Sequence, residues 1–202
     1  MRIGIFGGSF DPIHYAHLIL AEQCREQAEL DEVWLIPSAT APHKTDGSHA
    51  DEKQRLQMVE IALAGSNYLK PVDLELKRGG TSFTVDTLEQ IRADQPNAEL
   101  FLLMGGDSLA GFATWKDPER ICELAVPLVY SRLGAEADLS LLQPHVNDER
   151  LEHIKAMKIQ SRLIDISSTD IRDRVAGGKS IRYLLPRGVE AFIESHRLYR
   201  SH

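Results

Sequence analysis

Two histidines, His14 and His17, stand three residues apart directly after a glycine-rich segment, residues 7–12. A short apolar run at residues 2–6 precedes that segment, so the order predicts a strand, a glycine turn and the start of a helix. Glycines let a backbone approach an anion closely, and a helix start offers unpaired N–H groups and a partial positive charge. Two imidazoles at this spacing would project side by side toward the anion. The segment therefore predicts a phosphate-binding site.

Other interpretations of these residues stay open at this point. Histidines three residues apart on a helix can hold zinc if a third ligand joins them, and His43 is the histidine placed to supply one. A Gly-Gly turn can also be purely structural. The segment has neither the Gly-Lys-Ser/Thr ending of a P-loop nor the third glycine of the dinucleotide fingerprint. The two histidines beside Asp11-Pro12 favour phosphate.

Strand-like and helix-like patterns alternate along the whole chain. Besides residues 2–6, strands are predicted at residues 33–36, 72–76, 100–104, 127–131 and 162–166. Helices are predicted at residues 18–30, 51–65, 84–95 and 187–198, and after Asp117-Pro118, with caps at Asp51, Thr84 and Asp117. Residues 134–150 give no clear pattern. The alternation predicts an α/β fold with a doubly wound, mostly parallel, Rossmann-like sheet.

Polar clusters follow several of these strands. In a parallel sheet the carboxyl ends meet at one edge, where ligands bind. Lys44 and Arg172 would add positive charge there, and Asp107 would either cap a helix or accept from a ribose hydroxyl. Trp115 is a stacking platform for a flat ring or a core residue. Each residue alone has a structural explanation, and the convergence of four strand ends favours a site: residues 7–17, 40–44, 105–107 and 167–172.

Length and composition limit the classes of function. The 202 residues predict a single domain, and the net charge of −7 disfavours binding to nucleic acid. No apolar stretch is long enough to span a membrane, and a strand beginning at residue 2 or 3 leaves no room for a signal peptide. Cys24 and Cys122 match no metal or redox spacing. We therefore expect a cytoplasmic protein that binds small phosphorylated ligands.

Taken together, the motifs resemble those of the bacterial nicotinate-nucleotide adenylyltransferases, a family of the nucleotidyltransferase superfamily with a His-x-x-His signature. The match covers nearly the whole chain, and its first and last motifs are highly specific. Two departures are Ala16, where the family has glycine, and Leu133, where it has proline. The matching residues are 7–17, 42–44, 84–88, 106–108, Trp115 and 166–172.

The resemblance implies transfer of AMP from ATP to nicotinate mononucleotide, without a covalent intermediate. The implied catalytic residues are His14, His17, Lys44 and Arg172. Thr84 and Trp115 would bind nicotinate mononucleotide. Residues 162–202 would form the C-terminal phosphate-binding helix region of a single nucleotidyltransferase domain, 1–202. The implied ATP contacts are Gly7, Gly8, Ser9, Phe10, Gly106, Asp107, Ser167, Ser168 and Thr169.

Mg²⁺ is expected mainly on the triphosphate and water, because the motifs contain no carboxylate cage and no metal site of the protein's own is predicted. Two other functions stay in view. One is an adenylyl or cytidylyl transferase for phosphopantetheine or a phosphorylated alcohol, which chain length, the Thr84 helix and Trp115 disfavour. The other is a nucleotide-sensing module without turnover, which would need a broken histidine or arginine cluster.

Overall fold

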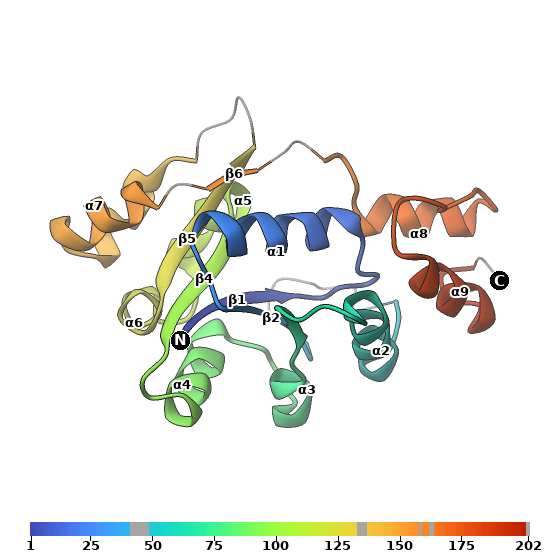
Figure 1. The fold of residues 1–202 in the computed structure, drawn as a ribbon, viewed down its shortest axis with the longest axis horizontal. Helices are drawn as coiled ribbons and strands as arrows, with labels where there is room; N and C mark the ends of the chain where they lie inside the picture. Colours follow the sequence, from blue (N-terminus) through green and yellow to red (C-terminus); the bar gives the residue numbers. More distant parts are fainter. Residues whose placement is uncertain (41–48, 133–136, 158, 162–163, 201–202) are drawn as a thin grey trace.

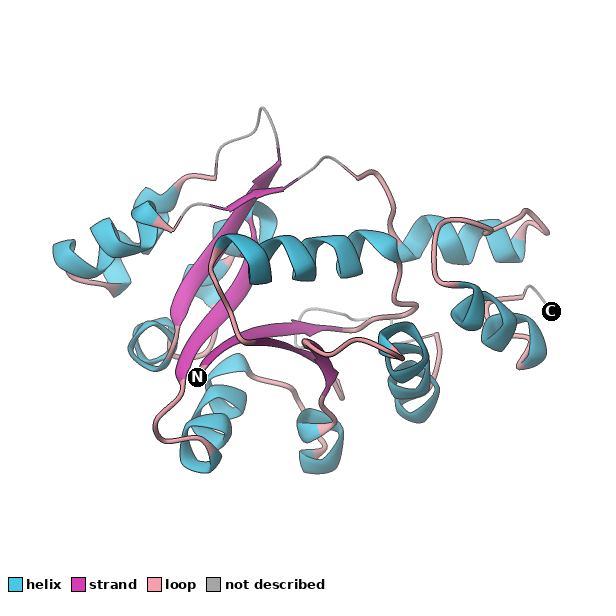
Figure 2. Cartoon of the chain, in the orientation of Figure 1, coloured by secondary structure: helices cyan, strands magenta, loops and turns pink. Residues whose placement is uncertain are grey.

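The computed structural model describes residues 1–40, 49–132, 137–157, 159–161 and 164–200 (Figure 1). Six parallel strands form one sheet in the order β3-β2-β1-β4-β5-β6, with helices on both faces (Figure 2). This arrangement confirms the predicted fold class. The strands are β1 (Arg2–Gly8), β2 (Glu32–Pro37), β3 (Leu69–Pro71), β4 (Glu99–Gly105), β5 (Val126–Arg132) and β6 (Ile159–Ser161).

Helix α1 lies on one face of the sheet, and α3 and α4 lie on the other (Figure 1). At one end of the molecule, α8 and α9 lie together beside the start of α1. The helices are α1 (Tyr15–Gln27), α2 (Glu52–Leu63), α3 (Leu74–Arg78), α4 (Thr84–Asp94), α5 (Gly106–Ala110), α6 (Pro118–Leu124), α7 (Asp148–Ala156), α8 (Ser168–Ala176) and α9 (Arg187–Ser195), with short 3-10 turns η1 (Phe112–Thr114) and η2 (Leu139–His145).

The strand order reverses direction between β1 and β4, which are the two central strands. Residues 100–104 of β4 are all buried, as expected for a parallel strand that is covered on both faces. At such a switch point the loops that leave neighbouring strands diverge to opposite faces, and a crevice opens between them. The topology therefore locates the expected ligand site at the carboxyl ends of β1 and β4.

Most helix boundaries follow the predicted caps. The side chains of Asp51, Asp117 and Ser167 accept from backbone N–H groups at the starts of α2, α6 and α8. The predicted cap at Thr84 is wrong, because Phe83 is the extended residue before α4 and Thr84 is already helical. A bridge between Thr40 and Thr81 keeps the chain extended just before this point.

Two predicted strands are also wrong. Residues 72–76 alternate in polarity, but β3 ends at Pro71, and Leu74 begins the short helix α3. The side chain buried in α3 is that of Glu75, which accepts from the Thr87 hydroxyl at 2.6 Å, so a polar contact overrides the apolar alternation. The last described strand is Ile159–Ser161, which pairs with residues 130–132 of β5. Of the predicted strand 162–166, residues 164–166 are not in a strand, and residues 162 and 163 lie outside the described residues.

Both cysteines are buried and free, and burial raises the pKa of each thiol to about 12. Within the described residues, no helix is both long enough and apolar enough to span a membrane.

Candidate active site

The two glycines of the first motif do not form the predicted turn. Gly7 and Gly8 are the last residues of β1, where they pair with Ile36 and Pro37 of β2. The turn lies instead at Asp11 and Pro12, and Phe10 just before it has a φ of 47° and a buried side chain. A Cβ atom on Gly8 would lie 3.2 Å from the Phe10 ring, so the absence of a side chain at Gly8 leaves room for that ring within the strand.

The two histidines lie side by side, as their spacing predicts. His14 is the N-cap of α1 and His17 is its third residue, and the ring centroids are 3.7 Å apart in a stacked arrangement. The His14 backbone N–H donates to Nδ1 of His17 at 3.3 Å. Because Nδ1 accepts this bond, the proton of a neutral His17 ring resides on Nε2. The rings of Phe6 and Phe10 pack edgewise against His17 and fix its plane.

His14 is only 4% exposed, and burial lowers the pKa of its imidazole from 6.5 to about 4. Its Nδ1 atom is buried and has no hydrogen-bond partner among the described residues. The ring is therefore neutral at neutral pH. A bound phosphate would favour the protonated ring and raise this pKa.

These histidines line a cavity of about 380 Å³, which we call the histidine cavity. Ser167 and Ser168, at the start of α8, also line it, so residues at the N-termini of both α1 and α8 border the cavity. Two helix starts and two imidazoles make it suitable for a polyanion. Its lining residues are Phe6, Ser9, His14, Ala16, His17, Leu20, Gln23, Tyr130, Ser161, Ile164, Ile166, Ser167 and Ser168.

A second cavity of about 310 Å³, the tryptophan cavity, lies across the wall formed by Phe6, Ser9 and Tyr130, which line both. It contains the predicted residues Thr84 and Trp115, and the predicted ATP contacts Gly7 and Gly8 line this cavity rather than the histidine cavity. Its other lining residues come mainly from the ends of β1, β2 and β4 and from the helices next to them: Ile5, Gly7, Gly8, Ile36, Ser38, Glu75, Ser82, Thr87, Leu102, Leu103, Met104, Gly105 and Ser108.

Other predicted residues lie outside the linings of these two cavities. Arg172 donates to the backbone carbonyl of Asp11 at 2.8 Å and to the Thr169 hydroxyl at 3.2 Å. Gly106 and Asp107 are exposed at the start of α5. Phe10 belongs to the loop after β1, and its side chain is buried. Lys44 and His43 lie outside the described residues.

The Asp11 carboxylate was not assigned a role from the sequence, although it stands within the first motif. It is 2% exposed and accepts from the N–H groups of His49 and Ala50, at 2.8 and 3.1 Å. It also accepts from the hydroxyl of Tyr199 at 2.7 Å. Burial and the Asp11 charge raise the pKa of Tyr199 above its usual value. Asp11 thus joins the loop after β1 to the start of α2 and to the C-terminal segment.

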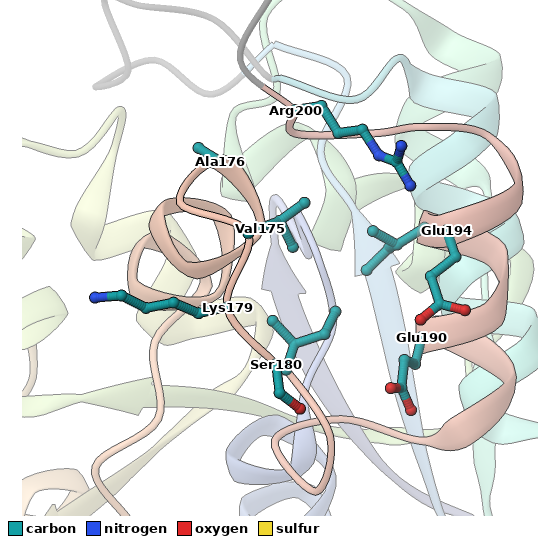
Figure 3. A pocket seen from close by; sticks show the side chains of 10 residues that line it. Val175, Ala176, Lys179, Ser180, Glu190, Glu194 and Arg200 are labelled. Carbon is teal, nitrogen blue, oxygen red and sulfur yellow. The ribbon is translucent and has the colours of Figure 1, made fainter.

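A larger cavity of about 640 Å³ lies between α8 and α9 (Figure 3). Glu190 and Glu194 of α9 face it, and Arg200 reaches toward Glu194. This cavity contains none of the predicted site residues. Its lining includes two carboxylates and two cationic side chains, Lys179 and Arg200, so it has no excess of positive charge to favour a phosphate.

Sequence reasoning also missed Tyr130 and Arg55. The signal for Arg55 was available, because it shares a helical face with Met58, Val59 and Leu63, all of them buried. An arginine on an apolar stripe must find hydrogen-bond acceptors inside the protein. For Tyr130 the sequence offered only its place near the end of a predicted strand.

The comparisons with known proteins agree with this architecture. A cytidylyltransferase-like family model matches residues 5–174. A Salinibacter ruber protein named "Probable nicotinate-nucleotide adenylyltransferase" is 42% identical over 201 residues, 99% of this chain and 98% of the relative. A Syntrophotalea carbinolica protein of the same name is also 42% identical, over 100% of this chain and 98% of the relative.

Among solved structures, a Plasmodium falciparum nicotinic acid mononucleotide adenylyltransferase complexed with NaAD has the same fold, with a TM-score of 0.76. It is 21% identical, and the alignment covers 98% of this chain and 97% of that one. With relatives at about 40% identity over the full length, the chain belongs to the nicotinate-nucleotide adenylyltransferase family, within the cytidylyltransferase-like proteins.

Proposed function

We propose that this protein transfers AMP from ATP to nicotinate mononucleotide, giving nicotinate adenine dinucleotide and pyrophosphate. The observation that carries the proposal is the pair of cavities with one common wall at Phe6, Ser9 and Tyr130. A group transfer between two bound substrates needs two sites that meet at the reacting atoms. The histidines stand beside that common wall.

ATP would occupy the histidine cavity. The starts of α1 and α8 offer backbone N–H groups, and Ser167 and Ser168 stand at the start of α8 within the region 162–202. Thr169, Arg172, Lys44, Gly106 and Asp107 are proposed as further ATP contacts on the family resemblance. Neither Thr169 nor Arg172 lines the cavity in this structure, so each would have to turn toward the phosphates.

Nicotinate mononucleotide would occupy the tryptophan cavity. Trp115 is half-buried at its wall and offers a flat face for the pyridine ring, while Thr84 lies at the N-terminus of α4. That helix start offers N–H groups and a partial positive charge to the nicotinate carboxylate. Gly7 presents open space on the side where a Cβ would be, next to Ser9. A substrate phosphate can approach the backbone there.

The proposed chemistry is one in-line displacement. An oxygen of the nicotinate mononucleotide phosphate forms a bond to the α-phosphorus of ATP, and the bond from that phosphorus to the bridging oxygen breaks. The pyrophosphate takes the electron pair. The attacking phosphate is mostly dianionic at neutral pH, its second pKa being about 6, so no general base is needed. Nε2–H of His17 would donate to the charge that builds on the transferred and leaving groups.

We propose that Mg²⁺ enters with ATP and stays on the phosphates and water, where it would offset their negative charge. Asp11, the buried carboxylate next to the histidines, is already bonded to His49, Ala50 and Tyr199. It is therefore not assigned as a metal ligand.

Pyrophosphate release, measured with ATP and a panel of phosphorylated acceptors, tests this function. Nicotinate mononucleotide should support release, and phosphopantetheine and phosphorylated alcohols should not. Release with phosphopantetheine alone would assign a different transferase. Nucleotide binding without release from any acceptor would indicate a sensing module.

A further inference from the structure

Arg55 lies at the start of α2, beneath the loops that follow β1 and β2. It is 0% exposed. Its Nη1 donates to the carbonyl of Ser9 at 2.8 Å, and its Nη2 donates to the carbonyls of Ser38 and Ala39 at 2.6 and 3.3 Å. One guanidinium thus holds two loops that come from different strands.

Both loops line the proposed substrate sites. Ser9 belongs to the wall between the two cavities, and Ser38 lines the tryptophan cavity. The loops are also joined directly, since the Ser38 N–H donates to the Gly8 carbonyl at 2.9 Å. A shift of Arg55 would therefore move the common wall relative to both substrates.

The direction of these bonds matters for an anion site. A carbonyl oxygen that faces a phosphate repels it, whereas an N–H group attracts it. In a trans peptide the C=O and the following N–H point in opposite directions. When Arg55 holds the Ser9 carbonyl toward α2, the N–H of Phe10 points to the opposite side of the loop.

Two neighbouring carbonyls are also held by donors from α8, although the Asp11 carbonyl is followed by Pro12, which has no N–H group. Arg172 donates to the carbonyl of Asp11, and the Ser168 hydroxyl donates to that of Pro12, both at 2.8 Å. Before ATP binds, the loop after β1 is therefore held by its carbonyls from α2 and from α8, and the Arg55 and Ser168 bonds would remain if Arg172 turned toward the phosphates. Of these donors, Arg55 is the one that also reaches the loop after β2.

We propose that Arg55 is a positioning residue for the transfer reaction: it turns the Ser9, Ser38 and Ala39 carbonyls away from the phosphates and keeps the two substrate cavities in register. This inference rests on the proposed function. The buried guanidinium also carries a positive charge beneath the loops, which the nearby carboxylates of Asp11, Asp51 and Glu52 partly offset. A lysine would keep that charge but lacks the planar fork that spans both loops.

Arg92 provides a control with the same bonding pattern, although it is half-buried where Arg55 is fully buried. Its Nη1 and Nη2 donate to the carbonyls of Ala98 and Leu124, at 2.6 and 2.9 Å, just before β4 and β5. It performs the same kind of backbone bonding as Arg55, at the opposite, amino edge of the sheet. If Arg55 only stabilised the fold, its replacement would lower the free energy of unfolding, as replacement of Arg92 would, and would leave kcat of the folded protein unchanged.

The test compares R55K, R55M, R92K and R92M with the wild type, at a temperature where circular dichroism shows each to be folded. Pyrophosphate release gives kcat and both KM values. R55M should lose about 10²-fold in kcat, because misplacement of the order of 1 Å has that cost, and its KM values should change much less. R55K should recover part of the loss. The R92 variants should keep the wild-type kcat.

Wild-type kcat in both R55 variants would overturn the proposal, and so would equal losses in R55M and R92M. If R55M does not fold, kcat of R55K is compared with kcat of R92K. A lower kcat in R55K supports the proposal, and equal values overturn it. If the wild type itself releases no pyrophosphate with nicotinate mononucleotide, the proposed function fails. Calorimetric binding of a non-hydrolysable ATP analogue then tests Arg55 separately, and weaker binding by R55K than by R92K is the supporting result.

Discussion

The histidine cavity and the tryptophan cavity share the wall of Phe6, Ser9 and Tyr130, yet they are built in different ways. The first is framed by the starts of two helices and carries two imidazoles, one of which is buried and neutral. The second is formed largely by strand ends, with a tryptophan and several buried apolar side chains.

This difference separates two tasks. Helix starts and imidazoles interact with the negative charge on the phosphates, and this charge shifts as a phosphorus–oxygen bond breaks. The residues of the histidine cavity should therefore determine kcat. Apolar and aromatic side chains recognise the shape and flatness of the pyridine ring, which do not change in the reaction. The tryptophan cavity should therefore govern KM for the acceptor.

The largest expected effect comes from His17→Ala. Removing its Nε2–H donor should lower kcat by about 10²- to 10³-fold, with a much smaller change in KM for either substrate. Steady-state pyrophosphate release measures both. His153→Ala, an exposed histidine on α7, is the control and should behave as wild type. Equal kcat in His17→Ala and wild type would contradict the assignment of kcat to the histidine cavity.

The second effect concerns stability of the free protein. The pKa of His14 in the folded protein is lowered to about 4 by burial, so the unfolded chain binds more protons between pH 6.5 and 4. The contribution of the neutral His14 ring to the free energy of unfolding is therefore complete above pH 6.5. As the pH falls to 4, the free energy of unfolding decreases by about 3 kcal/mol in total. The free energy of unfolding, measured with urea at several pH values in this range, should rise with pH in the wild type. In His14→Gln it should depend less steeply on pH. Parallel curves would contradict a buried, neutral His14.

The smallest effect belongs to the tryptophan cavity. Trp115→Leu should raise KM for nicotinate mononucleotide about tenfold, or about 1.4 kcal/mol, through the loss of ring stacking, with kcat nearly unchanged. Trp34→Leu is the control. Trp34 is half-buried on β2, donates to Glu32 and does not line either cavity. A fall in kcat without a change in KM would show that Trp115 acts on the transfer step instead.

Local sequence patterns predicted much of the fold. The all-apolar run at 100–104, the cap residues Asp51 and Asp117, and the side-by-side histidines follow from spacing and propensity within a few residues. The prediction failed where a distant contact decided the local structure. Glu75 is buried in α3 because Thr87 bonds to it, and no pattern within residues 72–76 contains that partner.

The sequence by itself determined the alternation of strands and helices, hence a doubly wound sheet, and the residue types that meet at its carboxyl edge. These depend on interactions between residues close in the chain. Only the tertiary structure decided that Gly7 and Gly8 continue β1 and that Arg55 holds two separate loops. It also decided that Tyr199 reaches Asp11 from 188 residues away. Such contacts satisfy buried polar groups, and their partners are set by packing rather than by sequence neighbours.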